Sequence, residues 1–153
     1  MKLYLLRHGK ADWPDWDKPD DERPLTKDGK REMRRIAQFL AEMNVAPAAI
    51  LSSPLPRAWQ PAEIAAEALG LDVQEEPALR GFTATKARAL VKRSKAADLM
   101  LVGHEPDFSA VIRALTGGIV KLGKGGIARI DVEDDASAGR LVWLIPPKIA
   151  RRE

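Results

Sequence analysis

The sequence predicts an α/β sandwich with a mostly parallel central sheet, because short apolar runs alternate with longer segments of helical spacing. The runs, rich in branched residues, are LYLL (3–6), AILS (49–52), LMLVG (99–103), IARIDV (127–132) and LVWLI (141–145). The last two follow each other through DDASAG, which is typical of a hairpin turn. One edge of the sheet is therefore expected to be antiparallel.

Four helices are expected between these strands. The first lies in KDGKREMRRIAQFLAEMN (27–44), with Thr26 as its N-cap. Its apolar face consists of Met33, Ile36, Ala37, Leu40 and Met43. A second helix runs through about AEIAAEALG and ends at Gly70, a residue suited to the left-handed position after a helix. A third covers about TKARALVKRSK (85–95), and a fourth begins at Pro106, a favourable first helical residue.

Length and composition predict one domain, residues 1–153, of an ordinary globular protein. Hydrophobic residues make up 45% and charged residues 31%, a balance that excludes a disordered chain. The lack of cysteine excludes disulfides, a thiol nucleophile and cysteine-based metal sites, and two histidines alone do not make a histidine-rich metal site. No apolar run approaches the roughly 20 residues that span a bilayer. With no signal-peptide pattern, a cytoplasmic location is expected.

The charge of the chain points to anionic ligands without naming one. The formal net charge is +3 and the pI is about 9.3. The lysines and arginines are scattered and form no dense basic stripe with interleaved aromatic residues, which argues against a nucleic-acid surface. We therefore expect neither a nucleic-acid nor a membrane partner, and we expect a monomer.

Polar residues follow three of the predicted strands at the point where each strand ends. They are RHG at 7–9, SSP at 52–54 with Arg57 shortly after, and GHEP at 103–106. In open α/β sheets, ligands bind at the carboxyl ends of the parallel strands, so both histidines of the chain fall at one sheet edge. A single histidine at a strand end is more often structural. Two histidines and two arginines together indicate a site for an anion.

A phosphoryl group suits such a site. Arginine presents a planar fork of donors that matches phosphate oxygens in pairs, which fits Arg7 and Arg57. A neutral imidazole such as His8 can attack phosphorus and carry the phosphoryl group covalently. Fixed cations stabilise the charge on the equatorial oxygens of the transferring group. Gly9, next to the proposed nucleophile, would let the backbone approach the phosphate.

These residues resemble the histidine phosphatase (phosphoglycerate mutase-like) superfamily. Arg7-His8-Gly9, Ser52-Ser53-Pro54 with Arg57-Ala58, and Gly103-His104-Glu105-Pro106 occur in the superfamily's order over nearly the whole chain. The small size and the stretch RPLTKDG are most similar to its phosphohistidine phosphatase branch, the SixA type.

The resemblance implies a three-layer α/β/α fold, phosphoglycerate mutase-like, with His8 as the phosphoryl acceptor. Arg7, Arg57 and His104 would complete the phosphate pocket, and Arg23 is a candidate for its wall. The resemblance implies neither a metal nor an organic cofactor.

Two features depart from the superfamily pattern. Pro61 stands where similar sequences often carry threonine, so the helix is expected either to begin near Trp59–Pro61 or to be kinked there. The second departure is an acid. Phosphomonoesterases of this superfamily add a carboxylate that protonates the leaving alkoxide, and its expected place here lies near Arg80-Gly81, while Glu75 and Glu76 are expected to end a solvated strand.

The missing acid favours a substrate with a good leaving group, such as a phosphohistidine on a protein, over a phosphate ester. Two alternatives remain open: a small-molecule phosphomonoesterase or mutase of the same fold, and a catalytically silent module that binds phosphorylated partners. The segment DWPDWDKPDDER (12–23), with six acids and two tryptophans, is either a solvated loop whose tryptophans cover the sheet edge or a rim that docks the partner protein.

Two other stretches are expected to carry no function. GGIVKLGKGG (117–126) lacks the pattern of a nucleotide-binding loop, and its glycines are expected to serve turns and the entry to a strand. The terminal KIARRE is expected to be a frayed tail.

Overall fold

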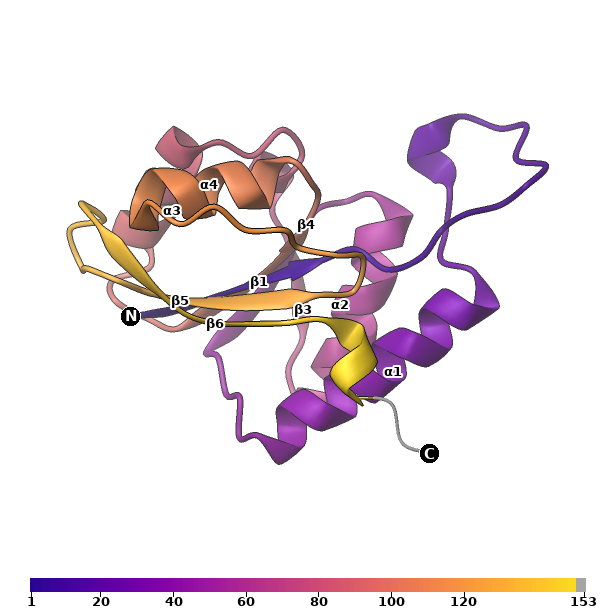
Figure 1. Cartoon of the computed structure of the whole chain (residues 1–153), viewed down its shortest axis with the longest axis horizontal. Helices are drawn as coiled ribbons and strands as arrows, with labels where there is room; N and C mark the ends of the chain where they lie inside the picture. Colours follow the sequence, from indigo (N-terminus) through magenta and orange to yellow (C-terminus); the bar gives the residue numbers. More distant parts are fainter. Residues whose placement is uncertain (151–153) are drawn as a thin grey trace.

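The computed structural model describes residues 1–150, which form one six-stranded sheet with helices on both faces (Figure 1). The strands are β1 (Lys2–Arg7), β2 (Ala49–Ser52), β3 (Val73–Glu75), β4 (Leu99–Gly103), β5 (Ile127–Val132) and β6 (Gly139–Ile145). The helices are α1 (Lys27–Glu42), α2 (Pro56–Leu69), α3 (Ala84–Arg93) and α4 (Asp107–Thr116), with 3-10 turns η1 (Asp20–Glu22), η2 (Pro77–Leu79) and η3 (Pro147–Ala150). Among these residues, no helix combines the length and the apolar character needed to cross a bilayer.

The strand order is β3-β2-β4-β1-β5-β6. β1, β2, β3 and β4 pair in parallel, whereas β5 pairs antiparallel with both β1 and β6. The predicted parallel sheet with one antiparallel edge is confirmed, and so is the final hairpin. β3 was not among the apolar runs, because this three-residue edge strand is largely exposed and carries no apolar pattern. Glu75, at its end, is exposed as expected.

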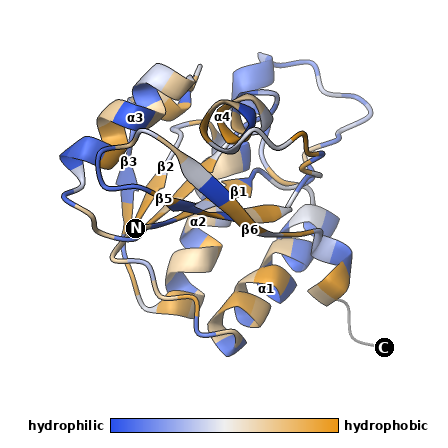
Figure 2. Ribbon diagram, turned by 60° about the vertical axis from the view of Figure 1, so that its left-hand side comes forward, coloured by the Kyte–Doolittle hydropathy of each residue, from blue (hydrophilic) through white to orange (hydrophobic). Residues whose placement is uncertain are grey.

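Two hydrophobic clusters separate the layers. On one face of the sheet, Leu3 and Leu5 of β1 pack with the apolar sides of α3 and α4. On the other face, Tyr4 and Leu6 pack with α1 and α2. Side chains alternate between the faces of a strand, so a central strand covered on both sides must be apolar throughout. Figure 2 shows helices with hydrophobic residues on one side and hydrophilic residues on the other. The three-layer α/β/α prediction is confirmed.

Helix α1 begins as its sequence predicts and ends earlier. The Thr26 hydroxyl accepts a hydrogen bond from the Gly29 amide at 3.0 Å, a cap that contributes about 1 kcal/mol. The apolar face is buried as predicted, with one exception. Met43 is 39% exposed, because the helix ends at Glu42 and the chain turns away through Asn44, whose φ is 59°.

Helix α2 contradicts one of the two alternatives for Pro61, a helix start near Trp59–Pro61, and a kink at Pro61 stays a prediction. The helix begins at Pro56, before the expected start near Trp59, and continues through Pro61 to Leu69. A proline inside a helix has no amide hydrogen for the carbonyl four residues earlier, which here belongs to Arg57. Gly70 follows the helix with φ 70°, as expected. Pro106, the expected first helical residue of the fourth helix, is instead the N-cap of α4, which begins one residue later at Asp107.

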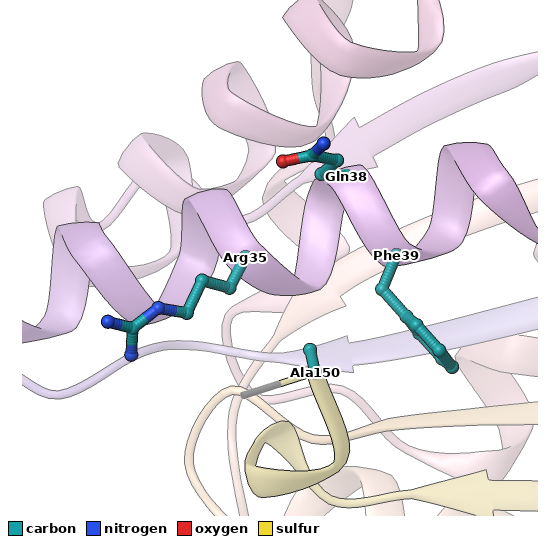
Figure 3. A pocket seen from close by; sticks show the side chains of 4 residues that line it. All are labelled: Arg35, Gln38, Phe39 and Ala150. Carbon is teal, nitrogen blue, oxygen red and sulfur yellow. The ribbon is translucent and has the colours of Figure 1, made fainter. Parts of the chain in front are cut away.

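The end of the described chain is packed, which corrects part of the expectation of a frayed tail. Pro147–Ala150 form η3, and Ala150 is buried against α1. A small pocket of about 120 Å3 lies at this contact, lined by Arg35, Gln38, Phe39 and Ala150 (Figure 3). The remaining residues of the predicted tail, 151–153, lie outside the described part of the chain.

Candidate active site

The two histidines meet because β1 and β4 are parallel neighbours. Arg7 pairs with Gly103 in the strand register, and the His8 amide donates to the Gly103 carbonyl at 2.9 Å. The residues that follow each strand, His8 and His104, therefore leave the sheet at the same level. Their ring centroids are 5.5 Å apart. This juxtaposition is what the sequence pattern predicts for the carboxyl edge of the sheet.

His8 is held as a neutral imidazole with one nitrogen free. Its Nδ1 lies 2.9 Å from the Gly9 carbonyl oxygen, which can only accept, so Nδ1 carries the hydrogen. The pKa of His8 is lowered to about 4, mainly by burial and also by the nearby His104, Arg7 and Arg57, against the opposing effect of the Gly9 carbonyl. At neutral pH, Nε2 therefore has an available lone pair.

His104 is oriented by a buried serine. Its Nε2 lies 2.7 Å from the Ser53 hydroxyl oxygen, which also accepts from the Leu55 amide at 3.3 Å. Among residues 1–150, His104 Nε2 is the one acceptor near enough for the Ser53 hydroxyl hydrogen, so we assign the hydrogen of the imidazole to Nδ1. That Nδ1 is buried and has no partner within the described chain.

The pKa of His104 is also lowered to about 4. Burial is the main cause, followed by the positive charge of Arg57, while Asp21 acts in the opposite direction. The site is therefore cationic through its arginines, and both histidines are neutral at physiological pH. This refines the expectation of a pocket in which histidines and arginines together provide the positive charge.

Arg7 and Arg57 are fixed by backbone carbonyls from distant segments. Arg7 Nη1 donates to the Leu122 carbonyl at 2.9 Å, and its Nε is buried without a partner among residues 1–150. The Arg57 side chain is 13% exposed, and its Nη1 donates to the Asp20 carbonyl at 3.0 Å. Both guanidinium groups lower the pKa values of both histidines, so they lie at the same site.

The segment 12–23 projects from the carboxyl end of β1 (Figure 1). Two of its carboxylates, those of Asp20 and Asp21, form ion pairs with arginines at the site. Asp20 Oδ2 lies 3.5 Å from Arg57 Nη2, and Asp20 Oδ1 lies 3.0 Å from Arg23 Nη2. Asp21 forms an ion pair with Arg80. Asp20 thus links Arg23 to Arg57 through two ion pairs. The Nη1 of Arg23 also donates to the Ala11 carbonyl at 3.0 Å.

The sequence reasoning missed Asp20, Asp21 and the role of Ser53. The i,i+3 spacing of Asp20 and Arg23 was a usable signal for their ion pair, whereas the contact between Asp21 and Arg80 joins residues far apart in the chain. The tryptophans of this segment do not behave as a cover for the sheet edge. The indole N–H groups of Trp13 and Trp16 donate to carbonyls of Pro24 and Pro19, and the two rings contact each other.

Gly9 has a packing role that the sequence did not reveal. A Cβ at this position would lie 2.9 Å from Leu25 Cδ2 and 3.0 Å from Met33 Cγ. The missing side chain of Gly9 therefore faces the α1 side of the core. Its carbonyl, as described above, accepts the hydrogen bond that sets the His8 tautomer.

The two imidazoles provide a direct test of these electrostatics. We expect both to titrate near pH 4 rather than 6.5, because burial and neighbouring guanidinium groups disfavour the charged rings. Since the unfolded histidines bind protons at a higher pH than the folded ones, stability should fall as pH drops from about 6.5 to 4. The chain has only two histidines, so proton NMR of their ring resonances resolves both midpoints. Midpoints near 6.5 would contradict the assigned burial of the site.

Comparisons with known proteins agree with this geometry. The family model of the histidine phosphatase superfamily (branch 1) matches residues 3–87. An uncharacterised protein of Picosynechococcus sp. is 37% identical over 95% of this chain and 100% of its own length.

Solved structures show the same fold. The protein histidine phosphatase SixA complexed with tungstate has a TM-score of 0.88 at 24% identity, covering 99% of this chain and 100% of that one. A protein of Agrobacterium tumefaciens assigned as phosphohistidine phosphatase SixA has a TM-score of 0.82 at 26% identity, covering 95% of this chain and 98% of that one. The chain belongs to the histidine phosphatase superfamily (branch 1), and its fold is of the SixA type.

Proposed function

We propose that this protein is a phosphohistidine phosphatase that removes phosphoryl groups from a protein histidine through a phospho-His8 intermediate. The observation that carries the proposal is the neutral His8 with a free Nε2, set beside His104 and near Arg7 and Arg57. A nucleophile with an available lone pair and two fixed guanidinium groups are the components that phosphoryl transfer requires.

In the first step, His8 Nε2 attacks phosphorus in line with the departing nitrogen. A bond forms between Nε2 and phosphorus as the bond from phosphorus to the substrate imidazole breaks. Arg7 and Arg57 hold the equatorial oxygens, and His104, whose ring lies 5.5 Å from that of His8, donates to one of them. A substrate ring that is protonated on its other nitrogen leaves as neutral imidazole and takes no proton from the enzyme.

In the second step, water attacks the phosphorus of phospho-His8 and releases inorganic phosphate. Because Nδ1 of His8 keeps its hydrogen and donates it to the Gly9 carbonyl, the phosphorylated ring is cationic and departs as the neutral imidazole that began the cycle. One proton of the attacking water passes to solvent or phosphate. The scheme uses no metal or organic cofactor. Within residues 1–150, no three His, Asp or Glu side chains are grouped so as to hold a metal ion.

The surroundings of the site favour phosphohistidine over a phosphate ester. An alkoxide leaving group needs a proton donor, and the expected place for that acid holds Arg80. The carboxylates that reach the site, Asp20 and Asp21, both form ion pairs with guanidinium groups. An ionised carboxylate in such a pair is an acceptor only and has no proton to donate.

The test compares phosphate release from a phosphohistidine protein and from a phosphoserine peptide under the same conditions. We expect rapid release from phosphohistidine and release at least about a hundredfold slower from phosphoserine, since general acid catalysis of this kind is worth about that factor or more. Comparable rates would favour a small-molecule phosphomonoesterase or mutase. Binding of the phosphohistidine protein and the phosphoserine peptide without phosphate release from either would favour a catalytically silent module that binds phosphorylated partners.

The Ser53 hydroxyl offers a second test of the mechanism. We expect Ser53→Ala to lower kcat/KM on phosphohistidine protein about tenfold, because His104 loses the hydrogen bond that sets its orientation and tautomer. Ser52→Ala is the matched control: Ser52 is equally buried, but its hydroxyl donates to the Ser53 carbonyl and not to His104. Recovery of activity in Ser53→Thr and equal thermal stability of the two alanine variants would show a positioning role. Equal kcat/KM in both alanine variants would contradict it.

A further inference from the structure

A second concave site lies beside the proposed active site and is rich in lysine. It is a cavity of about 470 Å3 between the β1–α1 connection, the segment before β5 and the segment after β6. Its lining residues are Lys10, Glu32, Lys121, Gly123, Lys124, Pro146, Pro147 and Lys148. None of the proposed catalytic residues lines this cavity, so it is distinct from the proposed active site.

The lysines of this cavity outnumber the carboxylates that pair with them. Lys10 forms an ion pair with Glu32 at 3.7 Å, and Lys124 forms one with Asp12 at 2.8 Å. Within residues 1–150, neither Lys121 nor Lys148 has an ion pair or a hydrogen bond through its ammonium group. Two positively charged residues therefore line a concave surface without an ion-pair partner in the described chain, and such an arrangement raises the local concentration of anions.

The wall of the cavity is tightly packed. Gly125 has φ 76°, a left-handed conformation that suits glycine. A Cβ at this position would lie 3.3 Å from Met33 Sδ and 3.5 Å from Pro147 Cβ, so the segment before β5 is pressed against both α1 and the segment after β6. Pro146 and Pro147 add backbone rigidity, and Pro147 is the first residue of the packed turn η3. The site is therefore largely formed before a ligand arrives.

We propose that this cavity binds a phosphate-like oxyanion carrying two or more negative charges. Lysine ammonium groups bind phosphate as compact point charges with three donors each, and they need no fixed bidentate geometry. The volume accommodates a diphosphate-sized group. The binding itself does not depend on the reaction proposed above, because the two sites share no ligand-contacting residue.

The cavity is connected to the catalytic residues through a short backbone path. The Leu122 carbonyl, between Lys121 and Lys124 in sequence, accepts from Arg7 at 2.9 Å. The Gly125 amide donates to the His8 carbonyl at 2.9 Å. The anion can come from two sources: a free phosphorylated compound, or a second anionic group on the protein substrate.

The binding test is a calorimetric titration with pyrophosphate. We expect wild type to show two binding events, one at the proposed active site and one at the lysine cavity. The double variant Lys121→Ala/Lys148→Ala should weaken the cavity event about tenfold, the loss expected from two exposed charge interactions. Arg57→Ala should remove the other event and leave the cavity event in place. If the proposed active site of the wild type did not bind pyrophosphate, the titration would show only the binding event at the cavity.

The control is Lys30→Ala/Lys92→Ala, which removes the same charge from two exposed positions that do not line the cavity. This control should bind as wild type does. An unchanged isotherm in Lys121→Ala/Lys148→Ala would overturn the proposal. Equal weakening in both double variants would also overturn it, because the effect would then come from net charge alone.

The source of the anion is distinguished by kinetics, and this arm rests on the proposed function. If the anion belongs to the protein substrate, Lys121→Ala/Lys148→Ala should raise KM for phosphohistidine protein about tenfold and leave KM for the phosphoramidate ion unchanged. If the anion is a free compound, the variant should have wild-type KM for both substrates while the cavity event in the titration is still weakened.

Discussion

His8→Ala is expected to reduce turnover of phosphohistidine protein by about a thousandfold or more, because it removes the nucleophile of the proposed double displacement. Labelled substrate should leave acid-labile phosphate on wild type during turnover and none on the variant. His8 lies at the rim of the sheet, and the hydrogen bond from its amide to Gly103 is made by the backbone, so the fold should persist. Circular dichroism and thermal unfolding of the variant verify this.

His104→Asn is the companion variant for this experiment. It keeps a polar side chain beside Ser53 but removes the imidazole that we propose as a donor to the phosphoryl oxygens. We expect slow turnover with the covalent label still present on His8. A labelled His8→Ala protein, or turnover in that variant near the wild-type rate, would refute the covalent mechanism and leave only a binding role for the site.

Gly29→Ala is expected to destabilise the protein by about 3 kcal/mol, the largest stability effect that we predict. A Cβ at Gly29 would lie 2.2 Å from the Lys10 carbonyl oxygen, a backbone atom that cannot move without shifting the connection after His8. Alanine is the better helix former by about 1 kcal/mol, but that preference is smaller than the cost of the clash. Urea unfolding measures the free energy difference.

Gly123→Ala is the control for this glycine experiment. No atom lies within 4 Å of a Cβ at Gly123, and its φ is not positive, so stability should change by less than about 0.5 kcal/mol. We also expect Gly29→Ala to lower activity, because Lys10 follows His8 by two residues. A Gly29→Ala protein as stable as wild type would show that the β1–α1 connection can yield to the added methyl group.

Much of the fold could be predicted because periodicity reports burial directly. The alternation of apolar runs and helical segments indicated the parallel sheet, and Thr26 correctly indicated the start of α1. Local signals failed where they were weak or contradictory. The three-residue β3 has no apolar pattern. Pro61 suggested either a later start of the helix or a kink, and the helix begins at Pro56.

The residue types of the site and the strand ends that carry them could be identified from local sequence alone. His8 and His104 could be assigned to one edge because parallel strands share a direction. Their chemistry, in contrast, depends on tertiary contacts. Ser53 lies beside His104, both rings are neutral, and Asp20 and Asp21 form ion pairs with arginines of the site. All three properties depend on contacts between residues far apart in the chain. Burial and through-space charge set these properties, and neither is encoded in local spacing.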